Sequence, residues 1–184
     1  HRGGGIGQPS DPIGAEGKYT DPVLIRNGRE TSMKGYCTDI YFDAAMEFIE
    51  RSSKAKKNFF AYIATNAPHG PFHDVPKALY EEYSKVDFSP IIINKLKPAR
   101  LKQENDKLAR ISAMITNIDE NVGRLFRKLD ALDVTEDTIV IYLNDNGPNS
   151  RRYVGNMRGV KAGVDDGGIR TPLIFHWPAK VKAG

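Results

Sequence analysis

Residues Thr138 to Gly147 read T-I-V-I-Y-L-N-D-N-G, an apolar run that ends in an abrupt polar turn. The five apolar residues from Ile139 to Leu143 include two isoleucines and a valine. Such a run is typical of a strand buried on both faces of a parallel sheet. Residues 144–147 then lie at the carboxyl end of the strand, where ligands bind in open α/β sheets. Taken alone, the stretch is better explained as a tight Asp-Asn-Gly turn without a ligand.

Length and composition leave room for one globular domain around this strand. The chain has 184 residues, of which 40% are hydrophobic, 27% charged and 9% aromatic, a mixture that supports an ordinary core. No run approaches the ~18 apolar residues that cross a bilayer. The net charge of +4 comes from basic residues interleaved with acidic ones. We therefore expect neither a nucleic-acid nor a membrane partner, and the oligomeric state stays open.

The rest of the sequence alternates helix-like and strand-like segments. Before residues 139–143 we expect a helix over 38–53, a buried strand over 58–65, a short helix over 76–84 and a long helix over 101–132. After them we expect a third strand over 171–177. Thr38 is the expected N-cap of the first helix. This order predicts an α/β fold with a mainly parallel, mixed sheet flanked by helices. We expect one partial domain over residues 1–184, irregular at 1–35 and with its α/β core at 36–178, within a longer protein.

Polar side chains gather near the predicted carboxyl edge of the sheet. Asp145 and Asn146 offer oxygens that suit Ca²⁺ or Mg²⁺, although calcium takes about six to eight and two cannot complete a site. His69 and His73 follow the second strand on a proline-rich loop, N-A-P-H-G-P-F-H-D-V-P (66–76), so the same edge is their expected place. A lone His is more often structural than catalytic. The predicted topology, which aims His69 at Asp145, favours a site.

The segment that follows this edge is cationic. Residues 151–182 hold seven basic side chains against two acidic ones, which favours an anionic substrate, with a solvated basic surface as the alternative. Lys161 lies within R-G-V-K-A-G, where the glycines let the backbone approach a bound anion closely. Without further context, Lys161 is better explained as an exposed lysine on a mobile loop.

Three stretches, in this order and at this spacing, resemble the sulfatases, the arylsulfatase-type hydrolases of the alkaline-phosphatase-like superfamily. They are N-A-P-H-G-P-F (66–72), L-N-D-N-G (143–147) and M-R-G-V-K-A-G-V-D-D-G-G-I-R-T-P (157–172). A fourth stretch, G-Y-C-T-D-I-Y-F-D-A-A (35–45), is similar to the segment that opens a helix upstream of the family's histidine loop. The resemblance covers nearly the whole chain.

The resemblance implies a role for each main candidate residue. Asp145 and Asn146 would be calcium ligands. His69 would hydrogen-bond the sulfate ester and give a proton to its leaving oxygen, and Lys161 would hold the sulfate oxygens. These roles make chemical sense, because cleavage of a sulfate ester builds charge on the bridging oxygen, which an acid and a cation stabilise.

The same resemblance makes His73 and Arg158 candidates for substrate contacts, and it also exposes what the chain lacks. The family's nucleophile is a formylglycine made from Cys or Ser in a Cys/Ser-x-Pro-x-Arg motif. Cys37, the only cysteine, is followed by T-D-I-Y, and S-D-P-I-G (10–14) ends in Gly where the motif has Arg. The two N-terminal aspartates of the family's calcium site are missing as well. Asp166 stands where the family usually has Glu. We therefore expect the formylglycine and those ligands in a part of the protein that precedes this chain.

Three functions remain in view. In the first, the parent protein hydrolyses sulfate esters of a small molecule or glycan with calcium and formylglycine, and this chain, inactive alone, supplies half of the metal site. In the second, the same fold cleaves phosphate esters. In the third, a non-catalytic module binds sulfated or phosphorylated ligands through Lys161, Arg158 and His69. The upstream sequence would separate them. The resemblance implies a periplasmic, secreted or lysosomal setting.

Overall fold

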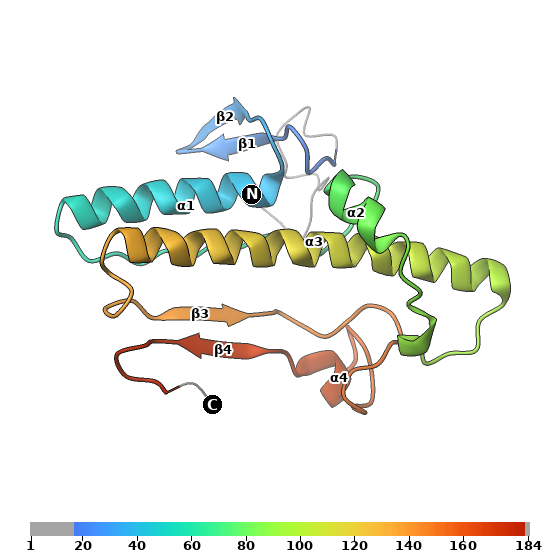
Figure 1. Ribbon diagram of the computed structural model, residues 1–184. Helices are drawn as coiled ribbons and strands as arrows, with labels where there is room; N and C mark the ends of the chain where they lie inside the picture. The colour runs from blue at the N-terminus through green and yellow to red at the C-terminus, as the bar shows by residue number, and fades with distance from the viewer. Residues whose placement is uncertain (1–16, 183–184) are drawn as a thin grey trace. The chain divides into compact units, whose positions relative to one another are not determined.

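The computed structural model describes residues 17–182, which fall into two compact units. Among these residues, those up to Val86 and Asp106–Leu132 form unit 1, and Asp87–Asn105 with the residues from Asp133 onward form unit 2. The elements in chain order are β1 Val23–Arg26, β2 Arg29–Ser32, α1 Cys37–Lys54, α2 Lys77–Tyr83, the short 3₁₀ helix η1 Ser89–Ile91, α3 Pro98–Ala131, β3 Val140–Leu143, α4 Asp166–Ile169 and β4 Leu173–His176 (Figure 1). The α/β class is confirmed. Within this part of the chain, no helix is long and apolar enough to span a membrane.

Helix α1 and the portion of α3 in unit 1 lie side by side and carry most of the core of that unit (Figure 1). Their buried apolar side chains include Ile40, Phe42, Met46, Ile49, Leu108, Ile111, Met114, Ile118, Leu125 and Leu129. Polar bonds add direction to this packing: Asn117 and Asn121 donate to the Asp39 carboxylate at 2.9 and 2.6 Å. Lys128 donates to Glu50 at 3.0 Å farther along α1. These bonds set how the two helices face one another.

The start of α1 corrects the prediction that Thr38 is its N-cap. The helix begins at Cys37 with Tyr36 as the N-cap, and no side chain caps its first N–H groups. Cys37 and Thr38 are 0% and 1% exposed, so Thr38 lies in the core instead of at the solvated end that a capping hydroxyl usually occupies. The Cys37 N–H donates to the carbonyl of Tyr19 at 2.7 Å. This bond joins the helix start to the segment before β1.

Prolines mark the starts of the next two helices. Helix α3 begins at Pro98, earlier than the predicted Leu101. Pro76 is the N-cap of α2, which runs over Lys77–Tyr83. A proline is tolerated at the first turn because the N–H that it lacks would have no partner within the helix.

Strands β1 and β2 form an antiparallel hairpin where the sequence predicted an irregular region. Asn27 and Gly28 make the two-residue turn between them, with φ of 52° and 81°. Type I′ hairpin turns need positive φ at both positions, which Asn-Gly accommodates well. The irregular prediction for residues 1–35 is therefore corrected over β1 and β2. Residues 1–16, which include S-D-P-I-G (10–14), lie outside the described part.

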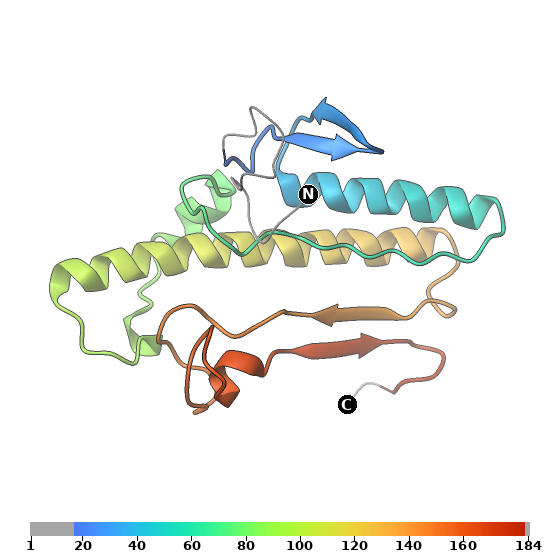
Figure 2. The ribbon, with the colours of Figure 1, turned by 180° about the vertical axis from the view of Figure 1, so that it is seen from behind.

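Residues 58–65, predicted as a buried strand, are extended but pair with no strand among residues 17–182 (Figure 2). Exposure alternates along the segment: Phe60 and Tyr62 are 87% and 81% exposed, whereas Phe59 and Ile63 are half-buried. An alternation of period two is the signature of strand backbone. The extended conformation was therefore predicted correctly. The predicted burial and strand assignment were wrong, because a strand needs a hydrogen-bonded partner strand, and burial on both faces needs a second covering layer.

Strands β3 and β4 form the sheet of unit 2, where the two predicted strands lie. Their pairing is antiparallel, with Val140 opposite His176 and Leu143 opposite Leu173. The expected parallel pairing is not found among the described residues. The chain returns from β3 to β4 through a loop that contains only the four-residue α4, not the crossover that a parallel connection needs. The expected burial is also corrected, since Leu143 and Leu173 are each 59% exposed.

Candidate active site

His69 lies in unit 1, on the loop between the extended segment and α2, and its side chain is exposed. Residues 66–76 are called the histidine loop below. The His69 Nδ1 lies 2.9 Å from the carbonyl oxygen of Gly70. Because a carbonyl oxygen can only accept, this contact puts a proton on Nδ1 and leaves Nε2 for an outside partner. When protonated, such an imidazole can donate a proton from Nε2.

The backbone of the histidine loop is tied to the segment before β1. The Tyr19 hydroxyl donates to the carbonyl of His69 at 2.7 Å, and the His69 N–H donates to the carbonyl of Asn66 at 2.9 Å. Near the far end of the loop, the Asp74 carboxylate accepts from the N–H groups of Tyr19 and Thr20 at 2.6 and 2.7 Å. It also accepts from the Thr20 hydroxyl at 2.7 Å. The loop is thus held at two points by one distant segment.

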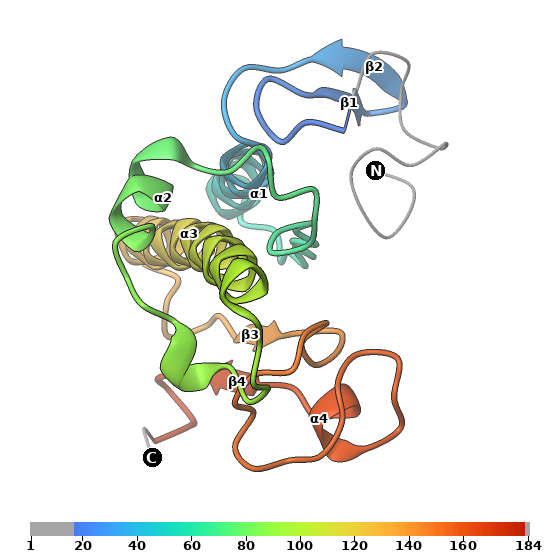
Figure 3. The same ribbon diagram turned by 90° about the vertical axis from the view of Figure 1, so that its right-hand side faces the viewer.

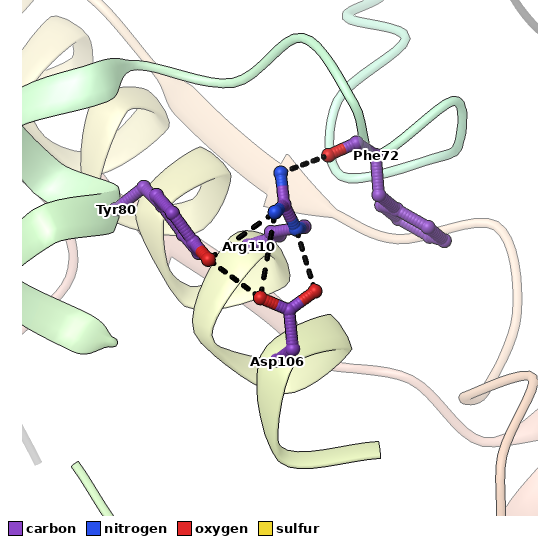
Figure 4. Close-up of polar contacts among 4 residues, drawn as sticks. All are labelled: Phe72, Tyr80, Asp106 and Arg110. Atoms are coloured by element: carbon purple, nitrogen blue, oxygen red, sulfur yellow. Dashed lines mark hydrogen bonds and ion pairs between the residues drawn. The ribbon is translucent and has the colours of Figure 1, made fainter. Parts of the chain in front are cut away.

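Arg110 of α3 holds the middle of the same loop (Figure 4). Its Nη1 donates to the carbonyl of Phe72 at 3.0 Å, and its Nε donates to Asp106 at 2.8 Å. The Tyr80 hydroxyl donates to Asp106 at 2.5 Å, and the Tyr80 ring centre lies 4.2 Å from the guanidinium carbon. Hydrogen bonding from Arg110 lowers the pKa of Asp106, so this carboxylate stays charged and keeps its partners.

His73 lies on the histidine loop with an exposed side chain. Ala67 belongs to the buried core cluster of unit 1, and Phe72 and Val75 pack against that cluster. The loop therefore buries its apolar side chains while both histidines face outward. Substrate contact by His73 stays a prediction.

Asp145 and Asn146 lie in unit 2 directly after β3, at the carboxyl end where the sequence predicted them. Their side chains touch, with the Asn146 amide donating to the Asp145 carboxylate at 2.9 Å. The preceding residue, Asn144, is anchored to the start of β4, because its carbonyl accepts from the Thr171 hydroxyl at 2.9 Å. A carboxylate and an amide therefore lie side by side at this end of the strand pair, with the amide N–H facing the carboxylate.

Residues 147–168, called the glycine loop below, fold back upon themselves and end within α4 (Figure 3). The Gly147 N–H donates to the carbonyl of Gly168 at 2.9 Å, and the Gly167 N–H donates to that of Arg158 at 2.7 Å. The chain segments are so close that a Cβ on Gly147 would overlap the Gly167 carbonyl oxygen and lie 2.9 Å from its carbon. At Gly159, with φ of +91°, a Cβ would lie 2.8 Å from the Cβ of Asp165. Glycine is required here by contact as well as by conformation.

This folding places the Lys161 backbone beside Pro148, in the segment that follows β3. The Lys161 N–H donates to the carbonyl of Pro148 at 2.8 Å, two residues after Asn146. The Lys161 side chain is half-buried, and its ammonium has no ion-pair or hydrogen-bond partner within residues 17–182. The side chain of Lys161 is therefore less exposed than the sequence taken without context predicted. An ammonium in such a place can take an anion as its partner.

Two other charged residues of the glycine loop are paired with neighbours. The Arg158 Nε lies 3.5 Å from the Asp165 carboxylate, and the Arg158 side chain is 88% exposed. Asp166 begins α4 and lies 3.6 Å from the Arg170 guanidinium. Asp166 thus belongs to the local structure of the loop, and substrate contact by Arg158 stays a prediction.

The predicted site residues therefore form two sets. Unit 1 holds the two histidines, and unit 2 holds Asp145, Asn146 and Lys161, with a backbone hydrogen bond from Lys161 to Pro148. The meeting of the two sets at one sheet edge stays a prediction. Among residues 17–182, no group of three or more His, Cys, Asp or Glu side chains is arranged to hold a metal ion.

Sequence reasoning missed the residues that hold the histidine loop in place. Asp106 and Arg110 did carry a readable signal, since acidic and basic residues four apart on a helix form pairs. Tyr19 and Asp74 carried none, because their bonds join residues 55 positions apart.

Comparisons with known proteins agree with these motifs. The N-acetylgalactosamine-6-sulfatase of Canis lupus familiaris is 26% identical over 176 residues, which cover 91% of this chain and 28% of that protein. A sulfatase of Formosa agariphila is 29% identical over 181 residues, covering 89% and 30%. The crystal structure of Ps i-CgsB in complex with k-i-k-neocarrahexaose has a TM-score of 0.68 and 27% identity, covering 86% and 32%.

The chain thus spans about a third or less of the length of these relatives. The model of the family described as Sulfatase matches residues 7–183, which is nearly the whole of this chain. The chain belongs to the sulfatase family, a family of sulfuric ester hydrolases.

Proposed function

We propose that the protein of which this chain is a part hydrolyses sulfate esters, and that this chain supplies part of its active site. The observation that carries the proposal is the folding of the glycine loop, in which the backbone N–H of the half-buried Lys161 donates to the carbonyl of Pro148, two residues after Asn146. A divalent cation held by Asp145 and Asn146, together with the Lys161 ammonium on the same substrate, would suit an oxyanion such as the monoanionic sulfate group of an ester.

His69 is the proposed proton donor. Breaking the S–O bond of the ester leaves negative charge on the bridging oxygen, and the Nε2–H of an imidazolium can transfer its proton to that oxygen. The Gly70 carbonyl, which accepts from Nδ1 at 2.9 Å, keeps a proton on Nδ1 and fixes which nitrogen serves the substrate. The released alcohol then carries the proton that His69 gave up.

Lys161 is proposed to hold the sulfate oxygens, and Asp145 and Asn146 to hold calcium. Calcium favours carboxylate and amide oxygens, and it takes about six to eight of them. To join Asp145 in binding it, Asn146 would turn its Oδ1 toward the ion, which replaces the present amide–carboxylate hydrogen bond. The remaining ligands would come from outside residues 17–182.

The remaining chemistry would also come from outside this chain. Formylglycine, when present, supplies the nucleophile that attacks sulfur, and we propose that it lies in the part of the parent protein that precedes residue 1. The isolated 184-residue chain is accordingly inactive. Sulfated sugars are the proposed substrate class, because relatives include N-acetylgalactosamine-6-sulfatases. A periplasmic, secreted or lysosomal setting accompanies this proposal.

The test compares sulfate and phosphate esters of the same alcohol with the full-length parent protein. We expect release of sulfate from N-acetylgalactosamine 6-sulfate or 4-nitrophenyl sulfate at a higher kcat/KM than release of phosphate from the matching phosphate esters. Treatment with EGTA should abolish the release, and added Ca²⁺ should restore it.

Three results would each overturn a part of this proposal. Faster turnover of the phosphate esters would favour phosphate-ester hydrolysis. Binding of sulfated sugars without turnover, unchanged by EGTA, would favour the non-catalytic module. Sulfate release by the isolated chain at the rate of the parent would refute the division of the active site.

A further inference from the structure

We propose that Tyr19 is a positioning residue for His69, acting through the backbone of the histidine loop. The inference rests on the proposed function, because it concerns the residue proposed to protonate the leaving group. It assigns a role to a residue that no sequence motif of the chain includes.

The geometry that carries the inference is a direct bond to the backbone of His69 itself. The Tyr19 hydroxyl donates to the His69 carbonyl at 2.7 Å, across 50 positions of sequence. Tyr19 is 0% exposed, and its ring stacks on that of Tyr36 with 5.5 Å between the ring centres. The donor is therefore held by a packed core, while the imidazole that it serves points outward from an exposed position.

The rest of Tyr19 is fixed as well. Its N–H donates to Asp74 at 2.6 Å, and its carbonyl accepts from the Cys37 N–H at 2.7 Å. Burial raises the pKa of the Tyr19 phenol above its usual value. The hydroxyl therefore stays protonated over the working range of an enzyme and remains a donor.

The consequence for catalysis is local. The Nδ1 of His69 bonds to the carbonyl of the next residue, Gly70, so the ring orientation depends on the backbone between the two residues. Tyr19 fixes the carbonyl at the start of that link. A proton donor must reach its oxygen within hydrogen-bonding distance, so a shift of the backbone lowers the rate more than it lowers binding.

Tyr36 provides a matched control. It is the other ring of the stack, it is 8% exposed, and its hydroxyl is buried without a hydrogen-bond partner among the described residues. Tyr19→Phe and Tyr36→Phe each remove one oxygen and keep the ring. Only the first removes a bond to His69.

The experiment uses the full-length parent protein and an alkyl sulfate ester of a sugar, whose leaving group needs a proton. We expect Tyr19→Phe to lower kcat by about tenfold, with KM within about twofold of the unsubstituted protein. Tyr36→Phe should leave both constants within about twofold. In a His69→Ala background, Tyr19→Phe should lower kcat by less than about twofold, because the group that it positions is gone.

Thermal unfolding of each variant verifies that the fold is retained. An active parent protein whose kcat is unchanged by Tyr19→Phe would overturn the positioning role. An equal loss from Tyr19→Phe with and without His69 would overturn it too, because that result belongs to a general structural effect. A parent protein that releases no sulfate would overturn the proposed function and, with it, this inference. Failure of the inference alone is recognised by an active parent protein whose kcat does not respond to Tyr19→Phe.

Discussion

The histidine loop and the glycine loop are both irregular segments that carry proposed catalytic groups, yet they are built in different ways. Side chains from elsewhere hold the histidine loop: Tyr19, at the segment before β1, bonds to His69 O, and Arg110 of α3 bonds to Phe72 O. The glycine loop is held by its own backbone, with bonds such as Gly147 N–H to the Gly168 carbonyl.

This difference decides which substitutions each loop tolerates. A side-chain anchor can be removed one bond at a time, so the histidine loop should lose function in steps. Backbone contacts at close range leave no room for a Cβ, so the glycine loop should fail as a whole when one glycine is replaced. The proposed chemistry of the loops differs as well, with a proton donor, His69, in one and a cation, Lys161, in the other.

The largest effect is expected from removing the acid itself. His69→Ala in the parent protein should lower kcat on a sugar sulfate by about 10²–10⁴-fold, the usual contribution of a general acid. On 4-nitrophenyl sulfate the loss should be much smaller, because nitrophenolate leaves without a proton. Steady-state kinetics with the two substrates checks this, and equal losses on both would contradict the assignment of His69 as the acid.

The next effect tests the rigidity of the glycine loop. Gly147→Ala places a methyl group against the Gly167 carbonyl, so the loop must open and Lys161 must move. We expect kcat/KM to fall by about 10²-fold, as for a misplacement of about 1 Å. Activity that survives this substitution would show that the loop adapts.

Gly123→Ala is the matched control for that substitution. Gly123 lies within α3, where its nearest neighbour is the Arg127 guanidinium, at 3.4 Å from an added Cβ. Alanine there should stabilise the helix by up to about 1 kcal/mol and leave activity unchanged. Thermal unfolding and sulfate release measure the two variants side by side.

A smaller, stepwise effect is expected from the second anchor of the histidine loop. Arg110→Ala removes the bond to the Phe72 carbonyl and leaves Asp106 without its ion pair. We expect a loss of about 1–2 kcal/mol in stability and a fall in kcat of less than about tenfold, because Tyr19 still holds His69. Urea denaturation and kinetics provide the check. A loss as large as that of His69→Ala would mean that the loop, too, fails as a whole.

The smallest effect concerns Glu50, which joins α1 to α3 through Lys128. Hydrogen bonds from Lys54 and Lys128 lower the pKa of Glu50 from 4.5 to about 2. A lowered pKa contributes stability above the unfolded value, and that contribution is lost as the pH falls from about 4.5 toward about 2. In the Glu50→Gln variant, the free energy of unfolding should therefore fall slightly less as the pH is lowered. Urea midpoints between pH 6 and pH 3 measure it, beside Glu120→Gln on the exposed face of α3 as control. Equal pH dependence of the urea midpoint in both variants would show that Glu50 makes no special contribution to stability.

The sequence predicted α1, α2 and α3 and the positions of β3 and β4, because these depend on local periodicity, but it predicted neither η1 nor α4. The hairpin of β1 and β2 was also readable, since Asn27-Gly28 follows V-L-I-R, but glycines elsewhere in the region suggested irregular chain. The pairing of β3 with β4 was not readable, because the alternation of apolar residues does not state the direction of the partner strand.

The candidate site was predictable in its residues but not in its support. Lys161 and the Asp145–Asn146 pair follow from short motifs, and the structure adds that one backbone bond, from Lys161 to Pro148, joins their neighbourhoods. Tyr19 could not be found from sequence, because its hydroxyl bonds to a backbone carbonyl. Every residue has such a carbonyl, so the bond leaves no pattern of residue types in the sequence.

The most direct test of the central proposal, a sulfate ester hydrolase whose glycine loop places Lys161 on the sulfate, is the kcat/KM of the parent protein carrying Lys161→Met. Lys180→Met, also in unit 2 and exposed, is the matched control. We predict a fall of about 10²–10³-fold for Lys161→Met, the usual cost of removing one preorganised charge-stabilising group, on sugar and nitrophenyl sulfates alike. Lys180→Met should release sulfate at the rate of the unsubstituted protein. Sulfate release by Lys161→Met within about twofold of that rate would contradict the account.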